Sequence, residues 1–144
     1  MASTNTSTLI SARPIIGIRH SGEHGCIHVV VNALKDAYAV FGLTNSLTTL
    51  ATIGPEESSN AEINQGKNVA NAAASTSTLQ HFIWSTLSHT HSFTIPHFDS
   101  KAAVDECILT TLPSLAPKSI FFYAGYYVSN LLELLPPVKD KIIW

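Results

Sequence analysis

Short apolar segments alternate along this chain with segments in which apolar residues recur at helical spacing. The apolar segments have the length of buried strands and lie at 14–18, 37–43, 79–85 and 119–123. Segment 37–43 (AYAVFGL) is suited to a strand that is covered on both faces. The helical spacing occurs at 26–36, 59–74, 99–111 and 128–135. Strands that alternate with helices predict an α/β fold, in which helices cover a parallel sheet.

The boundaries of these elements follow from local signals. Ser59-Asn60-Ala61-Glu62 has the S-x-x-E spacing of a capping box and predicts that a helix begins there. The segments 47–55 and 86–96 are expected to be loops. Cys107 falls on the apolar stripe of the helix 99–111, so we expect it in the core and not as a nucleophile.

Composition narrows the class of protein. The chain has 144 residues, the size of one domain, and a net charge of −2 without a basic patch, so no DNA binding is predicted. It contains no apolar run of transmembrane length and only two cysteines, too few for a disulfide-stapled secreted fold. We therefore expect a cytoplasmic protein, with the nucleus also possible. Residues 1–14, rich in Ser and Thr, are expected to be a disordered tail, and a weak mitochondrial presequence pattern is the alternative.

Candidate chemistry gathers where the predicted strands end, because ligands of open α/β sheets bind at the carboxyl ends of the strands. Thr44-Asn45 and Ser85-Thr86 follow two of these strands and could contact a ligand or serve as ordinary turn residues. His97 and Lys101 are four residues apart and in line with the apolar stripe of their helix. Lys101 could contact the ribose or phosphate of a nucleotide, or it could extend to water from the start of the helix.

Two other patterns are weaker. Gly17, Gly22 and Gly25 lie between a strand and a helix, as in a phosphate-binding turn, but their spacing does not match the dinucleotide patterns. His20, His24 and His28 are four residues apart, but Gly22 and Gly25 interrupt a helix there and no carboxylate completes a ligand set. No metal site is predicted.

Five segments together resemble the NmrA-like family, an atypical branch of the short-chain dehydrogenase/reductase superfamily, and especially its fungal members. They are NALKDAYAVFGLTN at 32–45, NQGKNVANAA at 64–73, HFIWSTL at 81–87, PHFDSKAAVDE at 96–106 and AGYYVSNLL at 124–132. The resemblance implies a Rossmann-type domain that binds NADP(H). It also implies either an oxidoreductase of secondary metabolism or a redox-sensing regulator that does not turn the nucleotide over.

The resemblance also implies roles for individual residues. Lys101 matches the lysine that holds the nicotinamide ribose, Thr44 and Asn45 would lie beside it, and Ser85 is near the catalytic serine position. Residues Ala124, Gly125, Tyr126 and Tyr127 match the segment that passes the nicotinamide. His97 stands where true dehydrogenases have tyrosine, and it could replace that residue as acid or base because its ordinary pKa is near neutral.

The chain departs from the family pattern at both ends. Before its 37–43 strand it has at most one strand, so we expect a partial Rossmann-like sheet, over residues 15–144, that lacks the usual N-terminal strands and the C-terminal substrate region. The first functional hypothesis is an oxidoreductase-like protein that binds NADP(H) and an unidentified small molecule. The alternatives are a non-catalytic redox sensor, acting through a second copy or a regulatory protein, and a degenerate fragment without nucleotide binding.

Overall fold

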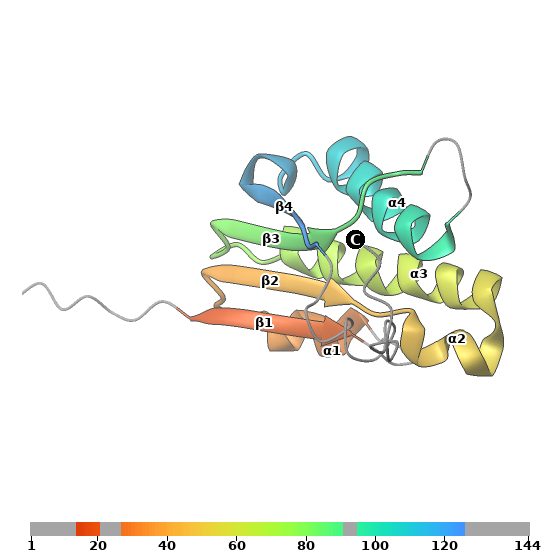
Figure 1. Ribbon diagram of the computed structural model, residues 1–144. Coiled ribbons are helices and arrows are strands. Elements are labelled where there is room, and N and C mark those ends of the chain that lie inside the picture. The colour runs from red at the N-terminus through yellow and green to blue at the C-terminus, as the bar shows by residue number, and fades with distance from the viewer. Residues whose placement is uncertain (1–13, 21–26, 91–94, 126–144) are drawn as a thin grey trace, which may run out of the picture.

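A computed structural model describes residues 14–20, 27–90 and 95–125 of this chain. Four strands form one parallel sheet in the order β1-β2-β3-β4: β1 (Ile15–His20), β2 (Ala39–Thr44), β3 (His81–Thr86) and β4 (Ser119–Tyr123). The helices are α1 (Ile27–Ala33), α2 (Leu47–Ile53), α3 (Pro55–Ala74) and α4 (Pro96–Thr111), and a 3₁₀ turn, η1 (Ala116–Lys118), precedes β4 (Figure 1). The expected α/β fold with a partial Rossmann-like parallel sheet is confirmed.

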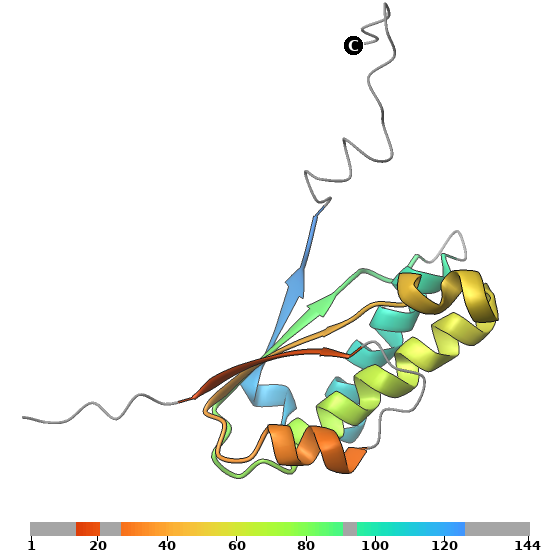
Figure 2. The ribbon, with the colours of Figure 1, turned by 90° about the horizontal axis from the view of Figure 1, so that it is seen from below.

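The helices α1, α3 and α4 all lie on one side of the sheet (Figure 2). This follows from the strand order, because each crossover is right-handed and advances in the same direction across the sheet. We call the other side, which none of these helices covers, the open face. The expectation that the second strand is buried on both faces is therefore only half right: Val40 is fully buried, whereas Phe41 and Leu43 are half-buried.

The core lies between the sheet and the helices, and Trp84 is at its centre. Its indole is fully buried against two glycines, Gly42 of β2 and Gly66 of α3. A Cβ atom on Gly42 would lie 3.0 Å from the Trp84 ring, and one on Gly66 would lie 2.5 Å from Val104 Cγ2. These glycines allow α3 to approach both the sheet and α4 closely.

Several predicted boundaries are wrong. Segment 47–53, expected as a loop, is helix α2. Helix α3 begins at Pro55 and not at Ser59, so Ser59 is no cap, and its hydroxyl instead donates to the Pro96 carbonyl. Helix α4 begins three residues before the predicted Asp99.

Other expectations have mixed outcomes. Helix α1 is shorter than the predicted 26–36, and Cys107 is only half-buried. The predicted tail 1–14, except Pro14, and the predicted helix 128–135 lie outside the described residues. Within the described part of the chain, no helix is long and apolar enough to span a membrane.

Candidate functional site at the carboxyl edge of the sheet

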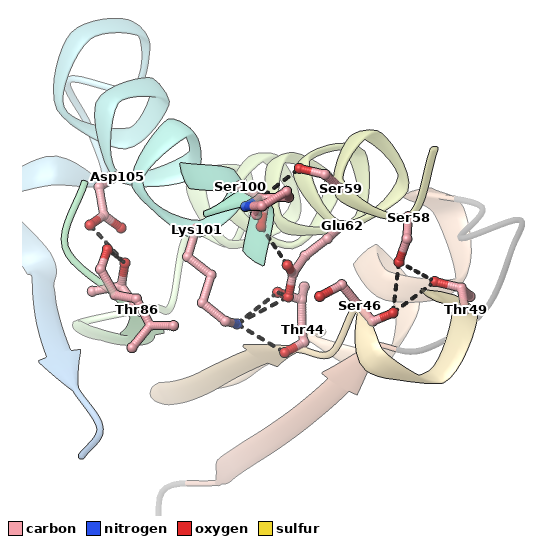
Figure 3. Close-up of polar contacts among 12 residues, drawn as sticks. Thr44, Ser46, Thr49, Ser58, Ser59, Glu62, Thr86, Ser100, Lys101 and Asp105 are labelled. Carbon is pink, nitrogen blue, oxygen red and sulfur yellow. Dashed lines mark hydrogen bonds and ion pairs between the residues drawn. The ribbon is translucent and has the colours of Figure 1, made fainter. Parts of the chain in front are cut away.

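Parallel strands bring residues from distant parts of the sequence to one edge of the sheet. The pairing places Thr44 next to His20, and Thr86 next to Tyr123. Thr44-Asn45, Ser85-Thr86 and Ala124-Gly125 therefore lie together at the carboxyl edge, as the sequence predicted. Helix α4 begins near the same edge and carries Lys101 to it (Figure 3).

The Lys101 side chain is buried and reaches the end of β2 (Figure 3). Its Nζ donates to the Thr44 carbonyl at 2.9 Å and to Thr44 Oγ1 at 3.1 Å, and it lies 3.3 Å from Glu62 Oε1. An ammonium group has three hydrogens, so these three contacts use all of them. The Nζ atom is also 5.6 Å from the centroid of a Trp84 ring, within the range of a cation–π interaction.

Glu62 is the counter-ion of Lys101 and is only 1% exposed. Its Oε1 accepts a hydrogen bond from Thr44 Oγ1 at 3.0 Å, and its Oε2 accepts one from the Ser100 hydroxyl. A buried carboxylate without such donors would be very unfavourable, so the four residues form one mutually dependent network. We call Thr44, Glu62, Ser100 and Lys101 the buried ion-pair network.

The capping-box interpretation of Glu62 is therefore wrong, and the sequence contained a signal for its real place. Glu62 precedes Gly66 by four residues and Ala70 by eight, so it continues the inner stripe of α3. An acid on the inner stripe of one helix and a lysine on the inner stripe of another predict a buried pair. The lysine was predicted as a site residue, whereas the acid was not.

A second polar group lies beside this network, at the end of β3. Asp105 Oδ2 accepts a hydrogen bond from Thr86 Oγ1 at 2.8 Å (Figure 3). Asp105 Oδ1 and Trp84 Nε1 are both buried and have no hydrogen-bond partner among the described residues. Burial raises the pKa of Asp105 to about 6, against the lowering effects of Thr86, the nearby Trp84 indole and the charge of Lys101.

The two candidate catalytic residues are not brought together. Ser85 is buried in β3 and alternates with Trp84 and Thr86, whose side chains face the helices, so its side chain faces the opposite side of the sheet. His97 is exposed at the start of α4, on the helix side, and its ring meets the Phe98 ring edge-on. No hydrogen bond joins Ser85 to His97 in the described part of the chain.

The remaining predicted residues are only partly described. Asn45 is half-buried after β2, Ala124 is half-buried after β4, and Gly125 is exposed. A Cβ atom on Gly125 would meet nothing within 4 Å, so there is open space beside the backbone at this edge. Tyr126, Tyr127, Gly22 and Gly25 lie outside the described residues.

The arrangement fits one end of a nicotinamide dinucleotide. The carboxyl edge offers a buried lysine, hydroxyl groups and an open glycine backbone, which suit a ribose and an adjacent flat ring. The described strands never reverse their order, so they do not form the crevice at a switch point where such sheets bind the whole dinucleotide.

Comparison with known proteins agrees with this architecture. Residues 21–143 match the model of the NmrA-like family, which is most of the chain. No curated protein matches the chain in sequence.

Proposed function

Because this chain belongs to the NmrA-like family, an oxidoreductase-like family that generally binds nicotinamide dinucleotides, we propose that it binds NADP(H) at the carboxyl edge of its sheet. We propose further that it acts as a redox sensor and not as a reductase. A sensor needs only a difference in affinity between two states or two partners.

Binding would rest on the residues that surround Lys101. Lys101 would donate to the nicotinamide ribose, with Thr44 and Asn45 beside it, and the backbone at Ala124 and Gly125 would leave room for the ring. When bound, the reduced nicotinamide ring could donate a hydride, and the oxidised ring could accept one. Because all three hydrogens of Lys101 have partners in the network, a ribose hydroxyl has to replace one of them, and Glu62 competes directly with the ligand.

The separation of Ser85 from His97 supports the sensor over the enzyme. Proton transfer requires a group within hydrogen-bond reach of the reacting atom, directly or through one water. A serine on the open face and a histidine on the helix side do not converge on one point. Among the described residues, the site therefore has groups for binding, and Ser85 and His97 do not form an acid–base pair.

Calorimetric titration with NADPH, NADP⁺ and NADH tests the proposal after circular dichroism has shown that the protein is folded. We expect micromolar affinity and a difference between NADPH and NADP⁺; NADH has the same nicotinamide ribose, so its affinity measures what the 2′-phosphate adds to binding. Lys101→Ala should weaken binding at least tenfold, whereas Lys118→Ala should not change it. Lys118 is a matched control, because its ammonium donates to the Leu79 carbonyl, before the first residue of β3.

Glu62→Gln is a second variant that does not remove the lysine. It lowers the competition for Lys101, so it should keep or increase the affinity for NADPH. A folded protein that binds no nucleotide, or a Lys101→Ala variant of unchanged affinity, would refute the proposed site.

The second candidate is an NADP-dependent oxidoreductase, acting in fungal secondary metabolism. The exposure of His97, one helical turn from Lys101, favours it, since an accessible imidazole can come within hydrogen-bond reach of a bound substrate. Substrate-dependent oxidation of NADPH that is lost in His97→Ala would support this candidate and reject the sensor.

A further inference from the structure

The open face of the sheet carries a continuous apolar surface. One row crosses it from Gly17 through Phe41 and Ile83 to Ile120, because these residues pair with one another in the register of the sheet. Phe122 flanks the row, with its ring centroid 6.3 Å from that of Phe41. Ile120 and Phe122 are 53% and 50% exposed, and a Cβ atom on Gly17 would meet nothing within 4 Å.

This surface is unusual for a parallel sheet. Such sheets occur almost only with both faces covered, and none of the four strands contains an acidic residue that would favour contact with water. The open face therefore needs a cover from elsewhere.

A second copy of the chain fits this face poorly. Four strands about 4.8 Å apart and about 20 Å long give a footprint of roughly 400 Å². A stable interface buries about 800 Å² on each partner, so face-to-face packing of two such sheets falls well short. The footprint is instead close to that of one short helix and its flanking chain, since a helix is about 10 Å wide.

The chain itself provides a segment of suitable composition. Residues 126–144 directly follow β4 and Gly125, and 11 of these 19 residues are apolar, compared with 5 of the 13 residues in 1–13. Val128, Leu131, Leu132 and Leu135 have the spacing of one face of a helix.

The topology indicates the side on which this segment can pack. The crossovers from β1 to β4 run over one face because they are right-handed and advance in one direction. To pack on the sheet, the chain after the edge strand β4 has to run back toward β3 and β2. A right-handed connection in that reversed direction runs over the opposite face of the sheet. We propose that residues 126–144 pack on the open face, with the leucines of 128–135 against Phe41, Ile83 and Phe122.

Disulfide trapping tests the proposal in the full-length chain. In a background of Cys26→Ser and Cys107→Ser, Ile83→Cys is combined with Leu132→Cys and oxidised in a glutathione buffer. We expect an intramolecular disulfide that forms roughly tenfold faster than in the control, which pairs Ile83→Cys with Ser129→Cys on the polar side of the predicted helix. A disulfide-linked dimer would identify a second copy as the cover and overturn the proposal, and so would equal rates for the two pairs.

A charge variant supplies an independent measurement. Leu131→Asp with Leu132→Asp should increase the binding of a hydrophobic dye and cause association in sedimentation experiments, because the open face becomes exposed. Ser129→Asp with Asn130→Asp adds the same charge and should behave as the parent does. If both variants behave as the parent, the segment does not cover the face.

Discussion

The stability of the buried ion-pair network can be tested by removing its cation. In Lys101→Met the side chain keeps most of its volume, but the Glu62 carboxylate, 1% exposed, loses its counter-ion and keeps the hydroxyls of Thr44 and Ser100 as donors. At 3.3 Å and an effective dielectric constant of about 20, the lost attraction is about 5 kcal/mol before solvation is counted. Removing one partner of a buried pair costs about 3–5 kcal/mol, a large part of the stability of a domain this size.

A second substitution, at Glu62, shows whether the loss of stability comes from the unpaired charge or from the changed side-chain volume. In Lys101→Met with Glu62→Gln, no unpaired charge is left buried, so the double variant should recover about 2 kcal/mol relative to Lys101→Met alone. The measurement is urea unfolding followed by circular dichroism for the parent, both single variants and the double variant. A loss of less than about 1 kcal/mol in Lys101→Met, or two single effects that simply add, would show that the ion pair does not stabilise the fold.

Three further outcomes follow from the geometry. The pKa of Asp105 is raised to about 6, so the folded state favours the protonated form of this side chain. The protonated carboxyl therefore contributes most to stability below about pH 4, and this contribution is lost as the pH rises through about 6. Asp105→Asn should therefore flatten the pH dependence of stability in this range. After allowance for solvent screening, it should raise the stability at pH 7 by roughly 1 kcal/mol. An unchanged pH profile of the melting temperature would contradict this prediction. Gly66→Ala should cost about 1–3 kcal/mol in urea unfolding because its Cβ would meet Val104, and Val104→Ala should partly relieve that cost; additive losses would argue against a clash. Gly17→Ala meets nothing and should change stability by less than about 1 kcal/mol in the same assay, so a larger loss would mean that the open face is tightly packed there.

The strands were predictable because their signal is local. Each is a short apolar segment bounded by turn residues, and the parallel arrangement follows from the helices between them. Helix α2 was not predicted, because its local sequence does not favour a helix. Its sequence, LTTLATI, is rich in β-branched residues, which are poor helix formers. The helix also has contacts from outside its own sequence, since Ser58 Oγ of α3 donates to the Ser46 carbonyl and lies 2.8 Å from Thr49 Oγ1.

The site was only partly predictable for a similar reason. The spacing of His97 and Lys101 placed them on one helix face, and Lys101 is indeed buried. The same spacing did not show that His97, at the first turn of α4, is exposed, because this depends on where the sheet ends beneath the helix. Glu62 was misassigned because S-x-x-E is a local pattern, whereas its partners are 18 and 38 residues away in the sequence.

The strand order also determines which strands unfold first. In the described sheet each strand pairs only with the strands next to it in sequence, so no pairing ties the first strand to the last. Such a sheet resembles a linear array, in which stability is a sum over neighbours and unfolding starts at the ends. Amide hydrogens of β2 and β3 should exchange with solvent more slowly than those of β1 and β4, since each edge strand can detach while the inner pair stays intact. Folding can likewise begin at the inner β2-α3-β3 unit and spread outward in both directions.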